Sequence, residues 1–292
     1  MSVPEVGTPS TIRYLVVVSE EDPVATAVAR QWGSRPATGD HLDGAAIRTL
    51  SDQALLVHRP GFHIHDDLFD QRLPAQLRRG GVTLVFPSVH RSESNIPTLT
   101  VHPIGNPGDA AEVGGRPRTL VPTDPRLMAS ALRALSARSK EAGMTATFEA
   151  THHGPAVELP AMFVEIGFGE DAVPPASAVR ILADTIPTLE LDGEDRIAMA
   201  IGGGHYAPHF TDLVLKRRWA FGHILSRHAL ASLDRETARR AYELTVGAEG
   251  WLAARVDDAG HSALTGVGVR LRDSDAPPRP RAGTPPTDAS GT

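Results

Sequence analysis

The chain has 292 residues, no cysteine and a formal net charge of −6, with an isoelectric point near 6.1. The lack of cysteine excludes disulfides and thiolate metal ligands, and no stretch reaches the roughly 18 uninterrupted apolar residues of a membrane span. The acidic balance argues against broad, non-specific nucleic-acid binding, which usually needs a basic face. Residues 1–10 show no basic segment followed by an apolar one. Without such an export signal, we expect a cytoplasmic protein.

Buried strands and helices alternate along most of the chain. Residues 12–18 form a nearly continuous β-prone run, and residues 24–32 follow it with helical character. The other expected strands are 54–57, 82–86, 99–102, 145–151, 162–167 and 197–201, and the other expected helices are 125–143, 177–186 and one or two within 229–252. This alternation predicts an α/β fold with a mostly parallel mixed sheet and flanking helices.

Composition divides the chain once, near its end. Residues 1–272 are expected to form one α/β hydrolytic domain, with room for a small α/β subdomain. Residues 273–292 are rich in proline and contain no large apolar residue, which predicts a disordered tail. The segment 216–218, Lys-Arg-Arg, is either a local basic patch or a solvated charged face.

Histidines follow three of the β-prone runs. His90 ends the segment 85–90, His152 and His153 lie in 148–155, and His205 lies in 200–208. In an open α/β sheet, ligands bind where the carboxyl ends of parallel strands meet, so these residues should share one polar site. Histidine both transfers protons near neutral pH and is the commonest metal ligand. The pattern therefore predicts a hydrolase, and His102, at the end of another short strand, is a further candidate.

Two glutamates lie in apolar, strand-like surroundings. Glu149 and Glu165 would be costly there unless they are paired, hydrogen-bonded or bound to metal. On a continuing strand Glu149 and His153 would face one way and His152 the other, so both histidines reach one site only if the strand has ended. For Glu165, a buried carboxylate that holds a neighbouring loop is an equally good interpretation.

A glycine-rich string precedes His205. Gly202, Gly203 and Gly204 let the backbone approach a ligand closely and leave N–H groups to stabilise an anion. The string is neither a Walker loop nor a dinucleotide-binding fingerprint. It predicts oxyanion donors beside a histidine that transfers a proton or binds metal. Without a Gly-x-Ser-x-Gly elbow or a cysteine, water activated by His, Glu or a metal ion is the expected attacking group.

Three other histidines have weaker patterns. His63 and His65 would share one face of an extended segment and could bind metal as a pair, although solvated loop histidines are the simpler interpretation. His223, in 221–225, either takes part in the site or fixes a loop.

Taken together, several strings resemble the D-aminoacyl-tRNA deacylase family of the archaeal and plant type. They occur in the family's order within residues 12–252, at 88–94, 99–106, 149–155, 163–167, 202–208, 210–212 and 222–225. The resemblance implies a phosphorylase/hydrolase-like α/β fold. It also implies a chiral proofreading reaction, in which the ester of D-aminoacyl-tRNA is hydrolysed to free D-amino acid and tRNA. Family members are described as zinc proteins, which suits a cysteine-free site of His and Glu.

The resemblance implies a role for each candidate residue. Water or a metal-bound hydroxide would attack the ester carbonyl at the 3′ end of an aminoacylated tRNA, and no membrane or DNA partner is implied. The residues assigned to catalysis are His153, His205, Glu149, Gly203 and Gly204; those assigned to substrate binding are Ser88, Glu93, Asn106, Tyr206 and Lys216; and those assigned to zinc are His90, His102, His152 and Glu165. Which histidine is the base and which is a ligand stays open.

The chain also departs from the family. Residues 168–175 lack the tryptophan usual after the 163–167 string, and His209 stands where arginine is common. These differences bear on the substrate, so a metal-dependent hydrolase of a small ester or amide on the same scaffold is the alternative. A third hypothesis, after the deacylase and the small-ester hydrolase, is an RNA-end or nucleotide-binding module with an inactive site.

Overall fold

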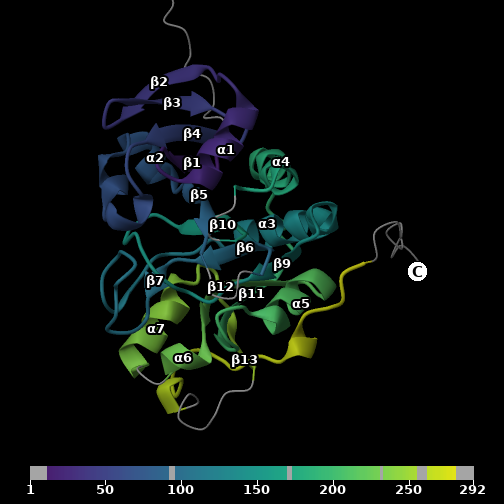
Figure 1. Cartoon of the computed structure of the whole chain (residues 1–292). Coiled ribbons are helices and arrows are strands. Elements are labelled where there is room, and N and C mark those ends of the chain that lie inside the picture. Colours follow the sequence, from purple (N-terminus) through teal and green to yellow (C-terminus); the bar gives the residue numbers. More distant parts are fainter. Residues whose placement is uncertain (1–11, 92–95, 170–172, 231–232, 255–261, 281–292) are drawn as a thin grey trace, which may run out of the picture.

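The computed structural model describes residues 12–91, 96–169, 173–230, 233–254 and 262–280. Figure 1 shows a large sheet in the upper and middle part of the molecule and a smaller sheet below it. The large sheet has the strand order β2-β3-β4-β1-β5-β10-β6-β9, and the small sheet has the order β12-β11-β13. The strands are β1 Tyr14–Ser19, β2 Ala37–Leu42, β3 Ala45–Thr49, β4 Ala54–Arg59, β5 Thr83–His90, β6 Thr98–Pro103, β7 Gly105–Asn106, β8 Thr119–Leu120, β9 Thr145–Phe148, β10 Ala161–Gly167, β11 Arg196–Gly202, β12 Trp219–Leu225 and β13 Gly250–Ala254.

Most neighbouring strands run parallel. In the large sheet β4, β1, β5 and β10 pair in parallel, β6 runs antiparallel to β10, and β9 is parallel to β6. All pairs of the small sheet are parallel. The central strands β1, β5 and β10 are almost entirely buried, as expected for strands covered on both faces. The predicted mostly parallel mixed α/β fold is confirmed.

Helices cover one face of the large sheet and fill the space between the sheets. The helices are α1 Pro23–Trp32, α2 Ala75–Gly80, α3 Pro125–Arg138, α4 Ala176–Thr185, α5 Pro208–Lys216, α6 Arg227–Leu230 and α7 Arg235–Leu244, with 3-10 helices η1 His63–His65, η2 Phe69–Arg72, η3 Ser139–Ala142, η4 Ile186–Thr188 and η5 Asp273–Asp275. Helix α3 contacts β6 and β9 of the large sheet and β12 of the small one, so it packs against both sheets. No described helix is long and apolar enough to span a bilayer.

The two faces of β10 have different surroundings. Val164 and Ile166 belong to the apolar core that includes residues of α1, α3 and α4. Phe163 belongs to a second core on the other face, with Phe86 of β5. Because alternate strand residues share a face, Glu165 lies on the Phe163 face, opposite those three helices. That face is where polar groups can gather without disturbing the helix-covered core.

A short bridge joins the large sheet to the small one. Just beyond β9, Glu149 pairs antiparallel with Tyr206, which follows β11. The N–H of Ala150 donates to the carbonyl of His205 at 2.8 Å, and the N–H of Thr151 donates to the carbonyl of Ile224 at 2.8 Å. The chain leaving β9 is therefore hydrogen-bonded to the carboxyl ends of β11 and β12.

Some elements differ from the expectation. One or two helices were expected within residues 229–252, and α7 is one of them, but after α7 the chain forms strand β13, which pairs with β11. The apolar run in β13 is too short for its period to distinguish strand from helix. The edge strand β2, its neighbour β3, helix α5 and strand β12 were not predicted; most residues of β2 are exposed, so β2 carries no apolar signal.

The disordered tail expected from residue 273 is wrong for residues 273–280. The indole Nε1 of Trp219 donates to the carbonyl of Asp273 at 3.1 Å, and Arg279 pairs with buried Asp195 at 2.5 Å. Pro278 forms an isolated bridge with Arg217. These hydrogen bonds and ion pairs attach the segment to the small sheet despite its lack of large apolar residues. The expectation for residues 281–292 lies outside the described residues.

Candidate active site

Seven ionisable side chains from five segments gather on the Phe163 face of the large sheet. They are His90 at the end of β5, His102 in β6, Glu149, His152 and His153 after β9, Glu165 in β10, and His205 after β11. The register explains the meeting: Glu165 lies beside Thr100 and Ser88, and His102 lies beside Phe163 on the adjacent strand. His90, His102, Glu149 and Glu165 are buried, His152 and His153 are partly exposed, and His205 is exposed.

The carboxylate of Glu149 lies at the centre of three of these imidazoles. Its Oε1 is 3.1 Å from Nδ1 of His90, and its Oε2 is 3.6 Å from Nε2 of His152 and 3.4 Å from Nε2 of His205. The residue is fully buried, yet neither oxygen has a hydrogen bond of acceptable geometry with a described residue. Burying a carboxylate without hydrogen bonds raises the free energy of the folded protein unless a cation balances its charge.

Glu165 lies between His90 and His102. Its Oε2 is 3.4 Å from Nδ1 of His90 and 3.6 Å from Nε2 of His102. Burial alone would raise the pKa of Glu165, but the two histidines outweigh it and hold the pKa well below its ordinary value. Burial likewise opposes the charged form of His90, and the nearby Glu165 and Glu149 raise the pKa of His90 to about 9. The carboxylate of Glu165 is therefore ionised at neutral pH.

His152 also belongs, with His102 and His153, to a group of imidazoles that have the orientation expected of metal ligands. The ring centroids of His102, His152 and His153 lie 4.1 to 4.8 Å apart, and one ring nitrogen of each lies within 4.8 Å of the others. In each, Nδ1 lies 2.7 to 3.1 Å from a backbone carbonyl, of Pro103, Ala150 or Gly154. An Nδ1–H donated there leaves Nε2 free as a ligand.

Burial also holds two of these rings in the form that binds metal. Burial and the neighbouring histidines lower the pKa of His152 well below 6.5. Burial and the charge of His102 lower the pKa of His153 to about 4. Both rings are therefore neutral at pH 7, as metal ligation requires.

The end of β9 explains how adjacent histidines reach one site. The strand stops at Phe148, so the two-residue alternation no longer applies at His152 and His153. His153 has φ of +42°, a left-handed conformation that is uncommon for a residue other than glycine. Such conformations cluster at functional sites, where the surrounding structure enforces them.

Of the predicted substrate residues, the structure brings Tyr206 to the cluster, together with the predicted catalytic glycines. The hydroxyl of Tyr206 lies 3.1 Å from Nε2 of His90, and Gly203 and Gly204 belong to the same loop. Two others are engaged within the protein. Ser88 donates to Asp22, which caps α1, at 2.7 Å, and Asn106 donates to the carbonyl of Gly114 at 2.9 Å.

The two remaining predicted substrate residues are not placed at the cluster. Lys216 ends α5, pairs with Asp212 at 2.9 Å and is 71% exposed. Because α5 begins beside the site, Lys216 lies roughly 12 Å further along the helix axis. Glu93 lies outside the described residues.

Phe163 is a site residue that the sequence analysis missed. Its ring stacks on His102 with centroids 5.0 Å apart and planes 3° apart, and it meets His153 edge-on at 4.8 Å. These contacts of the Phe163 ring fix the orientation of both imidazole rings. The available signal was its position two residues before Glu165, which places it on the same strand face.

The remaining candidate histidines lie around the cluster. His63 and His65 form a 3-10 turn, so the face-sharing expected of an extended pair does not arise. Buried His63 packs on Phe86, with centroids 4.9 Å apart. Fully buried His223 has Nδ1 3.1 Å from the hydroxyl of Thr151, which fixes the chain just before His152. His223 therefore has the loop-fixing position that the sequence left open.

Comparisons with known proteins point to one family. The sequence profile described as D-aminoacyl-tRNA deacylase matches residues 81–263. The D-aminoacyl-tRNA deacylase of Methanosarcina mazei is 32% identical over 222 residues, covering 75% of this chain and 74% of that protein. That of Thermoplasma acidophilum is 34% identical over 178 residues, covering 61% of this chain and 69% of that protein.

A solved structure agrees over nearly the whole chain. The crystal structure of a conserved protein of unknown function superimposes with a TM-score of 0.75 and 25% identity, covering 91% of this chain and 98% of that one. The resemblance drawn from the sequence strings is confirmed by the profile and by the curated relatives. The chain belongs to the D-aminoacyl-tRNA deacylase family.

Proposed function

We propose that this protein hydrolyses the ester between a D-amino acid and the terminal ribose of tRNA, and that its His/Glu cluster binds zinc. The observation that carries the proposal is the buried Glu149 carboxylate, which has no hydrogen bond within the described residues and lies among three imidazoles, one of which, His152, also belongs to a second group of three. The names of the curated relatives support the substrate. A substrate of this kind would place the enzyme in the cytoplasm.

The donor atoms of the cluster suit zinc. Imidazole nitrogens and carboxylate oxygens are ordinary zinc ligands, and a catalytic zinc site commonly uses three protein ligands. His102, His152 and His153 form one candidate set, and His90, Glu149 and His205 form another. Glu165 would orient His90 and His102 from behind. A zinc ion held here would supply Lewis acidity toward the ester carbonyl.

The protein's own groups would handle the proton. His205 is the most exposed imidazole of the cluster, with 44% of its side chain accessible, so it can reach substrate. Its Nε2 would take a proton from the attacking water while Glu149, 3.4 Å away, stabilises the imidazolium. The water oxygen bonds to the carbonyl carbon, the ester C–O bond breaks, and the ribose oxygen takes up the proton. The products are the D-amino acid and tRNA.

The glycine string would stabilise the negative charge on the carbonyl oxygen. The N–H groups of Gly203 and Gly204 donate to no other described residue. They precede His205 directly, so donors and base belong to one loop. Removing a single oxyanion donor in comparable sites costs roughly 100- to 1,000-fold in rate.

Hydrolysis of D-tyrosyl-tRNA in the presence of zinc tests this function. We expect rapid release of D-tyrosine, with L-tyrosyl-tRNA released no faster than in a no-enzyme control. Zinc-loaded protein that leaves D-tyrosyl-tRNA as intact as that control would overturn the proposal.

One observation favours the small-ester alternative. The basic segment 216–218 offers little free charge, because Lys216 pairs with Asp212, Arg217 donates to the carbonyl of Ala276, and Arg218 pairs with Glu194. D-tyrosine ethyl ester is the discriminating substrate. Turnover of the ethyl ester without turnover of D-tyrosyl-tRNA would establish that alternative.

A further inference from the structure

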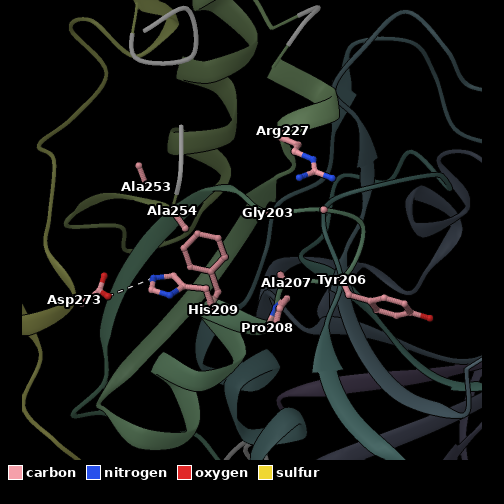
Figure 2. A pocket seen from close by; sticks show the side chains of 11 residues that line it. Gly203, Tyr206, Ala207, Pro208, His209, Arg227, Ala253, Ala254 and Asp273 are labelled. Carbon is pink, nitrogen blue, oxygen red and sulfur yellow. Dashed lines mark ion pairs between the residues drawn. The ribbon is translucent and has the colours of Figure 1, made fainter. Parts of the chain in front are cut away.

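A cavity of about 600 Å³ lies beside the loop that carries His205. It lies between the start of α5, the carboxyl ends of β11 and β13, and the C-terminal segment (Figure 2). Its walls include Gly203, Gly204, His209, Arg227, Ala254 and Asp273. This volume is within the usual range for small-molecule and cofactor sites.

The cavity and the His/Glu cluster share one wall. Gly204 and Tyr206 line the cavity, and they flank His205 in the chain. The Tyr206 hydroxyl lies 3.1 Å from Nε2 of His90 in the cluster. A ligand in the cavity therefore needs to extend only past the loop 203–206 to reach the cluster.

Arg227 supplies a positive charge to this cavity, and no acidic side chain of the described residues pairs with it. Its backbone N–H donates to the carbonyl of Gly203 at 3.0 Å, which fixes the residue beside the loop. Its guanidinium forms no hydrogen bond or ion pair with any other described residue. Figure 2 shows that side chain extending from α6 toward Gly203. A free guanidinium is well suited to bind a phosphate through two parallel hydrogen bonds.

Three other arginines in or beside the small sheet are already paired. Arg196 pairs with Glu249 at 2.7 Å, Arg218 with Glu194 at 2.5 Å, and Arg279 with Asp195 at 2.5 Å. The contrast makes Arg227 the distinctive cation of this cavity. An anionic ligand would complete its hydrogen bonding.

The rest of the lining combines polar groups with apolar residues such as Phe210 and Ala253. His209 lies with Nε2 3.4 Å from Oδ2 of Asp273, as the dashed line in Figure 2 marks. The Trp219 indole holds the Asp273 backbone in place. An apolar amino-acid side chain filling this space would remove water from these groups and from Arg227 without replacing their hydrogen bonds. A nucleotide matches this mixed lining better, because it combines a charged phosphate and a hydroxyl-bearing ribose with a flat base that can pack on the apolar residues.

We propose that the cavity binds the terminal nucleotide of tRNA, with the Arg227 guanidinium on its 5′-phosphate. The ester on the ribose of that nucleotide then lies across the loop 203–206, at the cluster. This inference rests on the proposed deacylase function. It assigns to Arg227 the contact with the nucleic-acid part of the substrate.

The test compares two substrates that differ in the nucleotide. The rates for D-tyrosyl-tRNA and D-tyrosine ethyl ester are measured for wild type, Arg227→Ala, Arg227→Lys and the control Arg240→Ala, an exposed arginine on α7 that does not line the cavity. We expect Arg227→Ala to lower kcat/KM for D-tyrosyl-tRNA about tenfold or more, chiefly through KM. Turnover of the ethyl ester should be unchanged, Arg227→Lys should recover part of the loss, and Arg240→Ala should match wild type.

Binding of deacylated tRNA gives a readout that does not depend on catalysis. Loss of one phosphate contact should reduce the slope of log Kd against log salt by about 0.7 in Arg227→Ala. An equal loss on both substrates, or no loss on tRNA, would overturn the inference. Wild type that cleaves only the ethyl ester would instead overturn the proposed function, so the two failures are distinguishable.

A second variant tests which part of the substrate occupies the cavity, by filling some of its volume. Ala254→Phe places a large ring in the cavity wall and should reduce cleavage of D-tyrosyl-tRNA while sparing the ethyl ester. If the variant instead changes the preference among ethyl esters of different D-amino acids, the cavity holds the amino-acid side chain and the inference is wrong.

Discussion

Oε2 of Glu149 lies 3.4 Å from Nε2 of His205, although the first follows a strand of the large sheet and the second follows a strand of the small one. The antiparallel bridge between Glu149 and Tyr206 enforces this approach. The candidate active site therefore exists only when both sheets are folded and docked.

Replacing Glu149 by glutamine should abolish most of the activity. The substitution removes the charge next to His90, His152 and His205 while keeping the shape of the side chain. We expect kcat/KM to fall at least about 100-fold, with a lower zinc content. Steady-state kinetics and elemental analysis check both quantities. The control Glu158→Gln changes an exposed carboxylate that accepts a hydrogen bond from Gln71 and should behave as wild type. Full activity of Glu149→Gln would contradict the assignment.

Metal content should separate His153 from His205. His153 contributes a neutral Nε2 to the group with His102 and His152, so His153→Ala should lose both zinc and activity. His205→Ala should lose activity about 100-fold or more but keep the zinc held by that group. The reverse pattern, with zinc retained in His153→Ala and lost in His205→Ala, would exchange the two roles.

Chelation should inactivate the protein and lower its stability. If zinc binds the folded cluster and not the unfolded chain, removing it takes away about 4 kcal/mol at a concentration 1,000 times its Kd. We expect a lower Tm after treatment with EDTA, and recovery of Tm and activity on adding zinc but not magnesium. An unchanged Tm and rate after verified metal removal would exclude the zinc site.

Stability should fall in mild acid because of His223. Burial lowers the pKa of His223 from 6.5 to about 3. Between these values the unfolded chain binds a proton that the folded protein does not, so this stability is present above pH 6.5 and lost as pH falls toward 3. The loss from this residue should reach about 2 kcal/mol between pH 7 and 5. Urea unfolding at both pH values checks it, and His223→Gln should show a correspondingly smaller decrease.

The buried carboxylate of Asp195 should make Arg133 important for stability. Arg133 pairs with Asp195 at 2.6 Å, and the Asp195 side chain is fully buried. Arg133→Met should cost about 3 kcal/mol in the free energy of unfolding because it leaves that charge with Arg279 alone. Arg138→Met is the matched control: Arg138 pairs with exposed Glu141 and Asp184, and its loss should cost less than about 1 kcal/mol. Equal effects in urea titrations would refute this reasoning.

The sequence predicted the parts of the fold that local apolar runs determine. The strands containing Val16, Val85 and Val164 were all expected, because buried parallel strands carry a strong continuous signal. The division into two sheets was not predicted, since pairing partners far apart in the chain leave no local pattern. Strand β12 was not predicted, because charged residues directly precede its first residue, Trp219, and interrupt the apolar pattern.

The site was predictable as a set of residues but not as an arrangement. Histidine and glutamate after or within β-prone runs indicated a common site. That His152 and His153 both face it depends on β9 ending at Phe148, which no pattern marked. The engagement of Ser88 with Asp22, and of Asn106 with the carbonyl of Gly114, depends on contacts across 66 and 8 positions of the chain. Such contacts cannot be read from the neighbours of either residue.

The carbonyl-anchored rings of His102, His152 and His153 have a practical consequence for anyone preparing this protein. Nitrogen ligands bind Ni²⁺ and Cu²⁺ readily, in the order set by the Irving–Williams series. Purification over immobilised nickel should therefore load a foreign ion into the same group of rings, even without an affinity tag. Enzyme for assay is better prepared on nickel-free resins, with its metal assigned by elemental analysis before any rate is interpreted.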